Sequence, residues 1–403
     1  MRVLIADRLA DGVADRLERV GCAVVVDPTL KNGALLDALR THDPEVLVVR
    51  STKVTAEHLA AARALGLVIR GGAGVNTIAV EAASARGICV SNCPGKNAVA
   101  VAELVFGHLL NLDRRISDNV ALLRAGGWAK KEFGKARGLH GRTMAVLGTG
   151  MIGQEVIARA HAFGIQVRAW SRSLTPEAAQ KLGVQFAASP LDACRGADVL
   201  TVHLAQCDAT RNIVDERILE SLAPGAFVIN TSRDGLLDHD ALLRVIERRD
   251  LKVGLDVFPD EPGANDDAYV HPIGQHPAIF GTHHIGASTT QASDAVADEV
   301  VRIIESWLRE GVAPNCVNLA ERTAATHVLV VRHADQVGVL ASILAELKEA
   351  GCNVQEMENT IFRGPGAAAS ARIQLSSPPC TDTLARLDAL PCVFASNLVA
   401  LDV

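Results

Sequence analysis

Residues 144–153 of the chain read Met-Ala-Val-Leu-Gly-Thr-Gly-Met-Ile-Gly, an apolar run that passes directly into a GxGxxG pattern. The run predicts a buried strand, the spacing over 154–163 predicts a helix, and 165–170 predicts the next strand. Glycines in such a turn let a pyrophosphate approach the helix N-terminus. A Gly-rich turn without a ligand is the alternative, but the flanking elements favour dinucleotide binding. The predicted contacts are Gly148, Gly150, Met151, Ile152 and Gly153.

The same alternation of apolar runs and helical patterns extends in both directions from this loop. Before the loop, short apolar runs lie at 3–6, 23–26, 46–49 and 67–69. After it, the alternation continues to about residue 284. Strands buried on both faces of a parallel sheet read as continuous apolar runs. The chain therefore predicts two parallel α/β sheets, with ligands bound beyond the carboxyl ends of their strands.

Two further segments complete the predicted organisation. A long helical pattern runs from 99 to 124 and ends at two glycines. Residues 326–403 show the order strand, helix, strand, strand, helix, strand, which predicts a separate α+β module. Three domains suit a chain of 403 residues.

Composition argues against several classes of protein. The net charge is −6 and no basic tract is present, so we expect no nucleic-acid partner. No apolar run has the length of a membrane span, and an acid at position 7 argues against a signal peptide. The nine cysteines include no CxxC pair, so reduced thiols and a cytoplasmic location are expected. The histidines at 271, 276, 283 and 284 follow no metal-ligand spacing, so no metal site is predicted.

The residues after the strand at 165–170 bear on the choice of cofactor. An acid at that point would accept hydrogen bonds from the ribose 2′-hydroxyl of NAD. The chain instead has Ser171, followed by Arg172, which suits the 2′-phosphate of NADP. A solvated Arg172, or one that stacks on adenine, is the alternative. The predicted cofactor is NAD(P), with NADP favoured and NAD left open.

Three later segments place charged residues close to apolar runs. Oxidation of a 2-hydroxy acid needs a cation for the carboxylate, a base for the hydroxyl proton and an acid that fixes the base. Taken singly, each of these charged residues could be an ordinary surface residue of a loop. Together, and in this order behind a dinucleotide loop, they predict a dehydrogenase that transfers a hydride. The predicted catalytic residues are Arg233, Glu261 and His284.

With these residues the chain resembles the D-isomer specific 2-hydroxyacid dehydrogenases over nearly its whole length. The segment Asn92-Cys93-Pro94, followed by Asn97, contributes to the resemblance. It implies that Arg233 binds the substrate carboxylate, that Glu261 supports the base and that His284 is the acid/base. Ser232 and Asp256 would lie beside the cofactor. Three positions depart from the family pattern, namely Ala205, His283 and Asp234, and the charge of Asp234 would weaken the grip of its neighbour Arg233 on substrate.

The resemblance also implies a domain arrangement. A Rossmann nucleotide-binding domain, residues 99–284, is inserted in a flavodoxin-like substrate domain formed by 1–98 and 285–315. The active site then lies in the cleft between them. A homodimer or homotetramer is expected, with contacts through the region of residues 99–140.

The amino-terminal loops resemble those of the phosphoglycerate dehydrogenases, a branch of this family. A phosphorylated substrate needs cations beyond Arg233, so D-3-phosphoglycerate, oxidised to 3-phosphohydroxypyruvate in serine synthesis, is the expected substrate. The predicted substrate contacts are Arg50, Lys53, Arg70, Gly72, Ala73, Gly74 and Asn97. An NADP-dependent glyoxylate or hydroxypyruvate reductase is the first alternative, and a dinucleotide-sensing corepressor is the second.

The module at 326–403 resembles an ACT regulatory domain. The resemblance implies serine as a ligand at His333, Asp335 and Asn353. The carboxylate of Asp335 would repel the carboxylate of an amino acid. The alternative is an oligomerisation module that binds no ligand.

Overall fold

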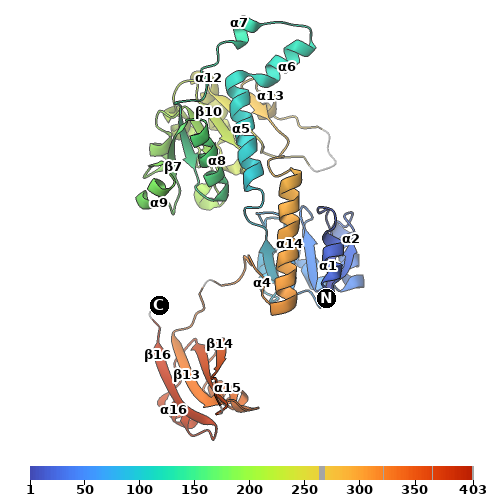
Figure 1. Cartoon of the computed structure of the whole chain (residues 1–403), viewed down its shortest axis with the longest axis vertical. Coiled ribbons are helices and arrows are strands. Elements are labelled where there is room, and N and C mark those ends of the chain that lie inside the picture. The colour runs from blue at the N-terminus through green and yellow to red at the C-terminus, as the bar shows by residue number, and fades with distance from the viewer. Residues whose placement is uncertain (263–267, 321, 365, 402–403) are drawn as a thin grey trace. The chain divides into compact units, whose positions relative to one another are not determined.

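The computed structural model describes residues 1–262, 268–320, 322–364 and 366–401, and the chain divides into two compact units. Unit 1 covers Met1–Asn318 and unit 2 covers Leu319–Val403. Within the described residues, unit 1 contains two parallel sheets and unit 2 contains one antiparallel sheet (Figure 1).

The first sheet of unit 1 has five parallel strands in the order β2-β1-β3-β4-β5. Its strands are β1 (Arg2–Ile5), β2 (Ala23–Val26), β3 (Val46–Val49), β4 (Leu67–Arg70) and β5 (Cys89–Asn92). The helices around it are α1 (Val13–Arg19), α2 (Asn32–His42), α3 (Ala56–Ala61), α4 (Val80–Ser84) and α14 (Thr290–Glu310). One core cluster joins α1 and α14 to the sheet, and another joins α2, α3 and α4 to it. Every residue of β3 is buried because helices cover both faces.

The second sheet has seven parallel strands in the order β12-β11-β10-β9-β6-β7-β8. Its strands are β6 (Thr143–Leu147), β7 (Gln166–Trp170), β8 (Gln185–Phe186), β9 (Val199–Val202), β10 (Phe227–Asn230), β11 (Lys252–Leu255) and β12 (Ile279–Gly281). The chain adds β7 and β8 on one side of β6 and β9 to β12 on the other. The loops that follow β6 and β9 therefore diverge, and a crevice opens at this switch point.

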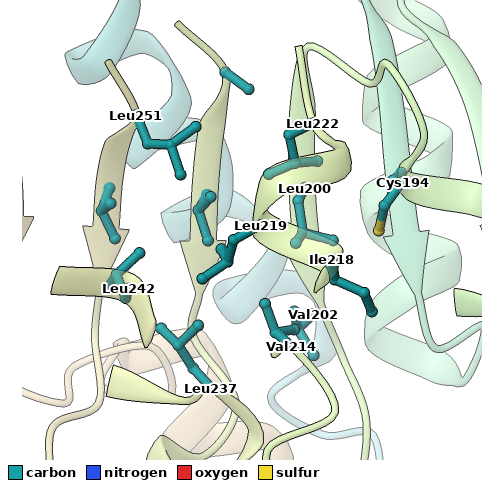
Figure 2. Packing of buried hydrophobic residues seen from close by; sticks show 14 of the residues in the cluster. Cys194, Leu200, Val202, Val214, Ile218, Leu219, Leu222, Leu237, Leu242 and Leu251 are labelled. Carbon is teal, nitrogen blue, oxygen red and sulfur yellow. The ribbon is translucent and has the colours of Figure 1, made fainter. Parts of the chain in front are cut away.

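Helices cover both faces of the second sheet. They are α8 (Met151–Ala162), α9 (Pro176–Lys181), α10 (Pro190–Cys194), α11 (Glu216–Ser221), α12 (His239–Arg248) and α13 (Pro272–Gln275), with 3-10 turns η1 (Asp208–Thr210) and η2 (Asp234–Leu236). Figure 2 shows the core on one face, where Leu219 from α11 lies beside Leu200 of β9, and Leu242 from α12 belongs to the same cluster.

The region predicted as one helix over 99–124 is two helices in the structure. They are α5 (Ala98–Arg114) and α6 (Ile116–Arg124), and α7 (Lys130–Phe133) follows. Arg115 separates them with a left-handed φ of +50°. The prediction of a continuous helix was wrong because apolar periodicity does not register a single left-handed residue. Helix α5 packs on the second sheet and on α8, whereas α6 has no buried residue.

Unit 2 is a four-stranded antiparallel sheet with two helices. Its elements are β13 (His327–Ala334), α15 (Val339–Glu349), β14 (Val354–Ile361), β15 (Ala368–Leu375), α16 (Thr381–Asp388) and β16 (Val393–Ala400). The strand order is β14-β15-β13-β16. Leu329, Ile343, Ile373 and Leu387 form its core.

The predicted fold class, two doubly wound parallel sheets followed by an α+β module, is confirmed. In the described part of the chain, no helix is both long enough and apolar enough to cross a bilayer.

Candidate active site

The loop between β6 and α8 has the geometry of a phosphate-binding turn. Gly148 has a left-handed φ of +105°, and a Cβ there would overlap the carbonyl oxygen of His203. A Cβ at Gly153 would overlap the carbonyl of Gly148, so close packing of helix and strand also requires glycine. By contrast, no atom lies within 4 Å of the Cβ position at Gly150. The space beside Gly150, at the N-terminus of α8, is therefore open, and a helix N-terminus with open space beside it suits a pyrophosphate.

At the end of β7 a hydroxyl stands in the place of an acid. The hydroxyl of Ser171 lies 2.8 Å from that of Thr149 in the glycine turn, so the two loops are joined by a hydrogen bond. Arg172, the next residue, is exposed. The chain thus presents a cation and two hydroxyl groups beside the crevice.

A histidine and a glutamate form the central pair of the site. Nδ1 of His284, just after β12, lies 2.7 Å from Oε2 of Glu261. This hydrogen bond raises the pKa of His284 above its usual value. Burial raises the pKa of Glu261, but hydrogen bonds from His284 and from the backbone N–H of Phe258 outweigh it, and the pKa lies below its usual value. Because Nδ1 of His284 is hydrogen-bonded to Glu261, Nε2 is the ring nitrogen that can contact a substrate.

Asp256 holds the backbone next to this pair. It is 1% exposed, and its Oδ1 accepts hydrogen bonds from the hydroxyl of Thr282 (2.6 Å) and the N–H of Ile285 (2.9 Å). Its Oδ2 accepts one from the N–H of Gly286 (2.8 Å). The residue was predicted as a cofactor neighbour. Asp256 lines the cavity described below. Both of its carboxylate oxygens accept hydrogen bonds from the loop around His284.

Arg233 extends from the end of β10 toward the first sheet. Its Nη1 donates to the carbonyl of Ser232 (2.6 Å), and its Nη2 lies 3.0 Å from the Cβ position of Gly74. No acid forms an ion pair with it among the described residues. A guanidinium that is not engaged by a described acid can bind the carboxylate of a substrate through two hydrogen bonds.

Arg70 and Arg50 add positive charge from the first sheet. Nε of Arg70 donates to the carbonyl of Arg50 (3.0 Å), and its guanidinium lies against Gly72. Burial lowers the pKa of Arg70, and the charges of Arg233 and Arg50 lower it further. The three guanidiniums therefore repel one another, and an anion placed among them would relieve that repulsion.

The loop that carries Arg50 is held by a buried carboxylate. Asp7 accepts hydrogen bonds from the backbone N–H groups of Arg50, Ser51 and Thr52, at 2.6, 3.0 and 2.9 Å. Burial raises the pKa of Asp7, but these bonds outweigh it and the pKa is below its usual value. Lys53, the next predicted contact, is exposed.

One cavity of about 840 Å³ brings many of these residues together. The predicted residues that line it are Ala73, Gly74, Asn97, Ile152, Ser232, Arg233, Asp256 and His284. Arg50, Lys53, Arg70 and Gly72 do not line it, nor do Gly148, Gly150, Met151, Gly153, Ser171, Arg172 and Glu261.

Sequence reasoning missed other residues that line the cavity. Gln206 follows β9, and its position after an apolar run could have predicted it as a residue of the site. Asn76 and Thr231 lie next to predicted residues, so a wider window would have found them. His203 also lines the cavity, and burial lowers its pKa to about 3, so the ring is neutral.

Comparisons with known proteins agree with this geometry. Residues 106–286 match the family model described as D-isomer specific 2-hydroxyacid dehydrogenase, NAD binding domain. The nucleotide-binding part of the chain, residues 106–286, belongs to the D-isomer specific 2-hydroxyacid dehydrogenase family. It is 35% identical over 321 residues to the D-3-phosphoglycerate dehydrogenase of Methanocaldococcus jannaschii, covering 79% of this chain and 60% of that protein. The enzyme of the same name from Mycobacterium bovis is 34% identical over 361 residues, covering 88% and 66%.

A solved structure of similar fold is that of the TT0316 protein from Thermus thermophilus. It is 29% identical, has a TM-score of 0.68, and covers 79% of this chain and all of that chain. The chain spans about 60% of the length of the first curated relatives that it matches.

Within this 2-hydroxyacid dehydrogenase fold, the structure shows the surroundings of Asp234 and of two histidines that were considered as metal ligands. No ion pair joins Asp234 to Arg233 in the described ranges, so the guanidinium of Arg233 stays open. His271 caps α13, accepting from the N–H of Ile273 (3.3 Å), and His276 accepts from the N–H of Ala278 (3.2 Å). Among the described residues, no group of three or more His, Cys, Asp or Glu side chains could hold a metal ion.

The three residues predicted to bind an amino acid in unit 2 lie in different surroundings. His333 is buried, and its ring nitrogens lie 2.8 Å from the carbonyl of Ala334 and 3.1 Å from Oδ1 of Asn359. Asp335 is exposed, and Asn353 lines a small pocket that includes neither of the other two.

Proposed function

We propose that the chain oxidises D-3-phosphoglycerate to 3-phosphohydroxypyruvate by hydride transfer to NAD(P). One observation carries the proposal: Arg233 and His284, which is hydrogen-bonded to Glu261, line one cavity together with Ile152 of the glycine turn after β6. That cavity combines a cation for a carboxylate with an acid/base next to a dinucleotide site. The relatives at 34–35% identity carry the same activity in their names.

The residues divide the chemistry between them. A nicotinamide dinucleotide held at the glycine turn would supply the acceptor for the hydride of the carbinol carbon. Nε2 of His284 takes the hydroxyl proton, while Glu261 keeps the proton of the ring on Nδ1 and stabilises the imidazolium that forms. Arg233 holds the substrate carboxylate so that the carbinol carbon stays in place. In reduction, His284 returns the proton to the forming hydroxyl.

The cations of the first sheet favour a phosphorylated substrate. A carboxylate uses one guanidinium, but Arg233 and Arg50 both lie close enough to Arg70 to lower its pKa. A phosphate group next to the carbinol would neutralise this excess positive charge.

The test compares oxidation of 3-phosphoglycerate with that of D-glycerate in wild type and in Arg70→Gln. We expect a preference for 3-phosphoglycerate, and a KM for it that rises about tenfold or more in Arg70→Gln, from loss of about 1.4 kcal/mol or more. Arg86→Gln, an exposed arginine of the same half of unit 1, is the matched control. Equal or better turnover of the unphosphorylated acid would refute the substrate assignment.

The second candidate is an NADP-dependent glyoxylate or hydroxypyruvate reductase. The observation in its favour is the end of β7, where Ser171 replaces an acid and Arg172 is exposed. We propose NADP as the preferred dinucleotide on the same ground. Steady-state rates with NAD and NADP, for wild type and Arg172→Ala, test this. A ratio of the two rates that Arg172→Ala leaves unchanged would exclude a role for this arginine.

We propose that a second copy of the chain covers α6 and the segment that follows it. The described residues of α6 include none that is buried, and Leu123 and Trp128 are 55% and 80% exposed. Apolar side chains gathered on one segment mark an association surface. A homodimer or homotetramer follows, and Lys130 and Lys131 would then lie at the interface.

We also propose that unit 2 binds serine and regulates the enzyme. Support comes from its separate core and from the pocket beside Asn353. Because both ring nitrogens of His333 already have partners, a ligand there would have to displace Asn359. Thermal unfolding with and without serine tests this, and no shift in Tm at millimolar serine would count against it.

A further inference from the structure

His108 is a buried polar residue in the middle of α5 that the proposed chemistry does not use. It is 4% exposed, and the other buried residues of α5 are all apolar. Its side chain lies against β11, where a Cβ at Gly254 would come within 2.9–3.1 Å of Cβ, Cγ and Nδ1 of the histidine. Its Nε2 lies 3.1 Å from Oγ1 of Thr282. The histidine therefore joins α5 to the loop after β12.

The direction of each hydrogen bond in the series His108–Thr282–Asp256 is fixed. The carboxylate of Asp256 can only accept, so the hydroxyl of Thr282, 2.6 Å away, donates its one proton to it. The oxygen of Thr282 must then accept from Nε2 of His108. Burial lowers the pKa of His108, so the ring is neutral at pH 7 and its single proton lies on Nε2.

At its other end, this series of hydrogen bonds reaches the backbone next to His284. Asp256 accepts from the N–H groups of Ile285 and Gly286. His284 itself has a left-handed φ of +51°, which a residue with a Cβ adopts only when its surroundings hold it there. The Cβ position of Gly286 also lies 3.5 Å from a methyl group of Val101 on α5. Helix α5 is thus the support on which this loop rests.

We propose that His108 is a positioning residue: through Thr282 and Asp256 it fixes the backbone of residues 284–286 and so aims the imidazole of His284. The inference rests on the proposed role of His284 as acid/base. It requires no contact between His108 and the substrate or the dinucleotide.

The test uses the full chain with His108→Leu, which removes the donor, and His108→Gln, whose amide N–H can reach the same place. His58→Leu is the matched control, because His58 is also buried and its Nε2 lies 2.9 Å from the carbonyl of Asn32, far from the loop. The first readout is backbone amide hydrogen exchange at Ile285 and Gly286. The second is kcat compared with the KM for the dinucleotide.

For His108→Leu we expect exchange at both amides to accelerate about three- to tenfold, as for the loss of one hydrogen bond, and kcat to fall by a similar factor. The KM for the dinucleotide should stay within about twofold, because no contact to it is lost. His108→Gln should restore both readouts, and His58→Leu should leave both amides unchanged.

Exchange at the two amides that is the same in His108→Leu and wild type would overturn the inference, whatever the activity. Unchanged exchange together with a lower kcat would do so as well, since the effect would then not pass through the loop. If the wild type oxidises no 2-hydroxy acid, the proposed function fails while the exchange data still decide whether His108 holds the loop.

Discussion

At the scale of single residues, Glu261 sets the pH range in which His284 can work. Its carboxylate raises the pKa of the imidazole through their 2.7 Å hydrogen bond. Oxidation needs the neutral ring, so wild-type kcat/KM should fall as pH drops through this raised pKa. In Glu261→Gln the pKa of His284 decreases, so the fall should occur at lower pH, and kcat should drop about 10- to 100-fold.

The measurement is the pH profile of kcat/KM in the oxidation direction, with Glu247→Gln, an exposed glutamate of α12, as the control. In the reduction direction the ring must be protonated, so the loss of activity at high pH should also move to lower pH in Glu261→Gln. Profiles that coincide for Glu261→Gln and wild type would contradict the pairing.

The sequence predicted some of these side chains and not others for physical reasons. Arg233 follows a buried strand, and the carboxyl ends of parallel strands meet at one edge of the sheet. Its position in the site could therefore be predicted. Arg233, Glu261 and His284 also occur in an order that matches one chemistry. His108 was not predicted, because a histidine in an apolar helix looks like any core residue until its partner Thr282, which is 174 residues away, is known.

At the scale of elements, Glu299 joins three segments of unit 1. This buried residue of α14 contacts Lys96 (3.1 Å), Arg302 (2.5 Å) and Asn315 (2.6 Å), and these contacts lower its pKa to about 2. A depressed pKa contributes stability above the unfolded value of 4.5 that is lost as pH falls through about 2. Glu299→Gln should therefore lower the free energy of unfolding by about 2 kcal/mol at pH 7.

The difference between Glu299→Gln and wild type should shrink between pH 4.5 and pH 2, which denaturant unfolding across that range would reveal. Glu310→Gln, at the exposed end of the same helix, should change the free energy of unfolding by less than about 0.5 kcal/mol. A difference that stays constant with pH would show that the carboxylate charge is not what stabilises the cluster.

Element boundaries show the same limit of sequence reasoning. Strands β1 to β4, β6 and β7 were predicted close to their true positions, because continuous apolar runs mark the strands of a parallel sheet. The break at Arg115 was not predicted, since it depends on one backbone angle. That break matters for function, because it separates the buried α5 from the exposed α6.

At the scale of the whole molecule, the exposed segment from α6 to Trp128 should determine the state of association. Replacing Trp128 or Leu123 by Glu puts a charge in a surface that we expect a second copy to bury. Sedimentation should show a dimer or tetramer for wild type and a dissociation constant at least about 30-fold higher for Trp128→Glu, since buried Trp residues at interfaces contribute about 2 kcal/mol or more. Val26→Glu, at another exposed apolar site, should leave the dimer intact.

The division into two units predicts which part of the chain contains the chemistry. Every residue that lines the cavity belongs to unit 1, whose sheets have their own cores. A chain ended after Ala320 keeps Asn318, whose side chain bonds the N–H of Val90 (2.8 Å) and the carbonyl of Ile88 (2.9 Å). We expect this shortened chain to fold and to keep kcat within about twofold of the full chain, while losing any response to serine. A shortened chain with native circular dichroism and cooperative unfolding but no turnover would show that unit 2 takes part in catalysis.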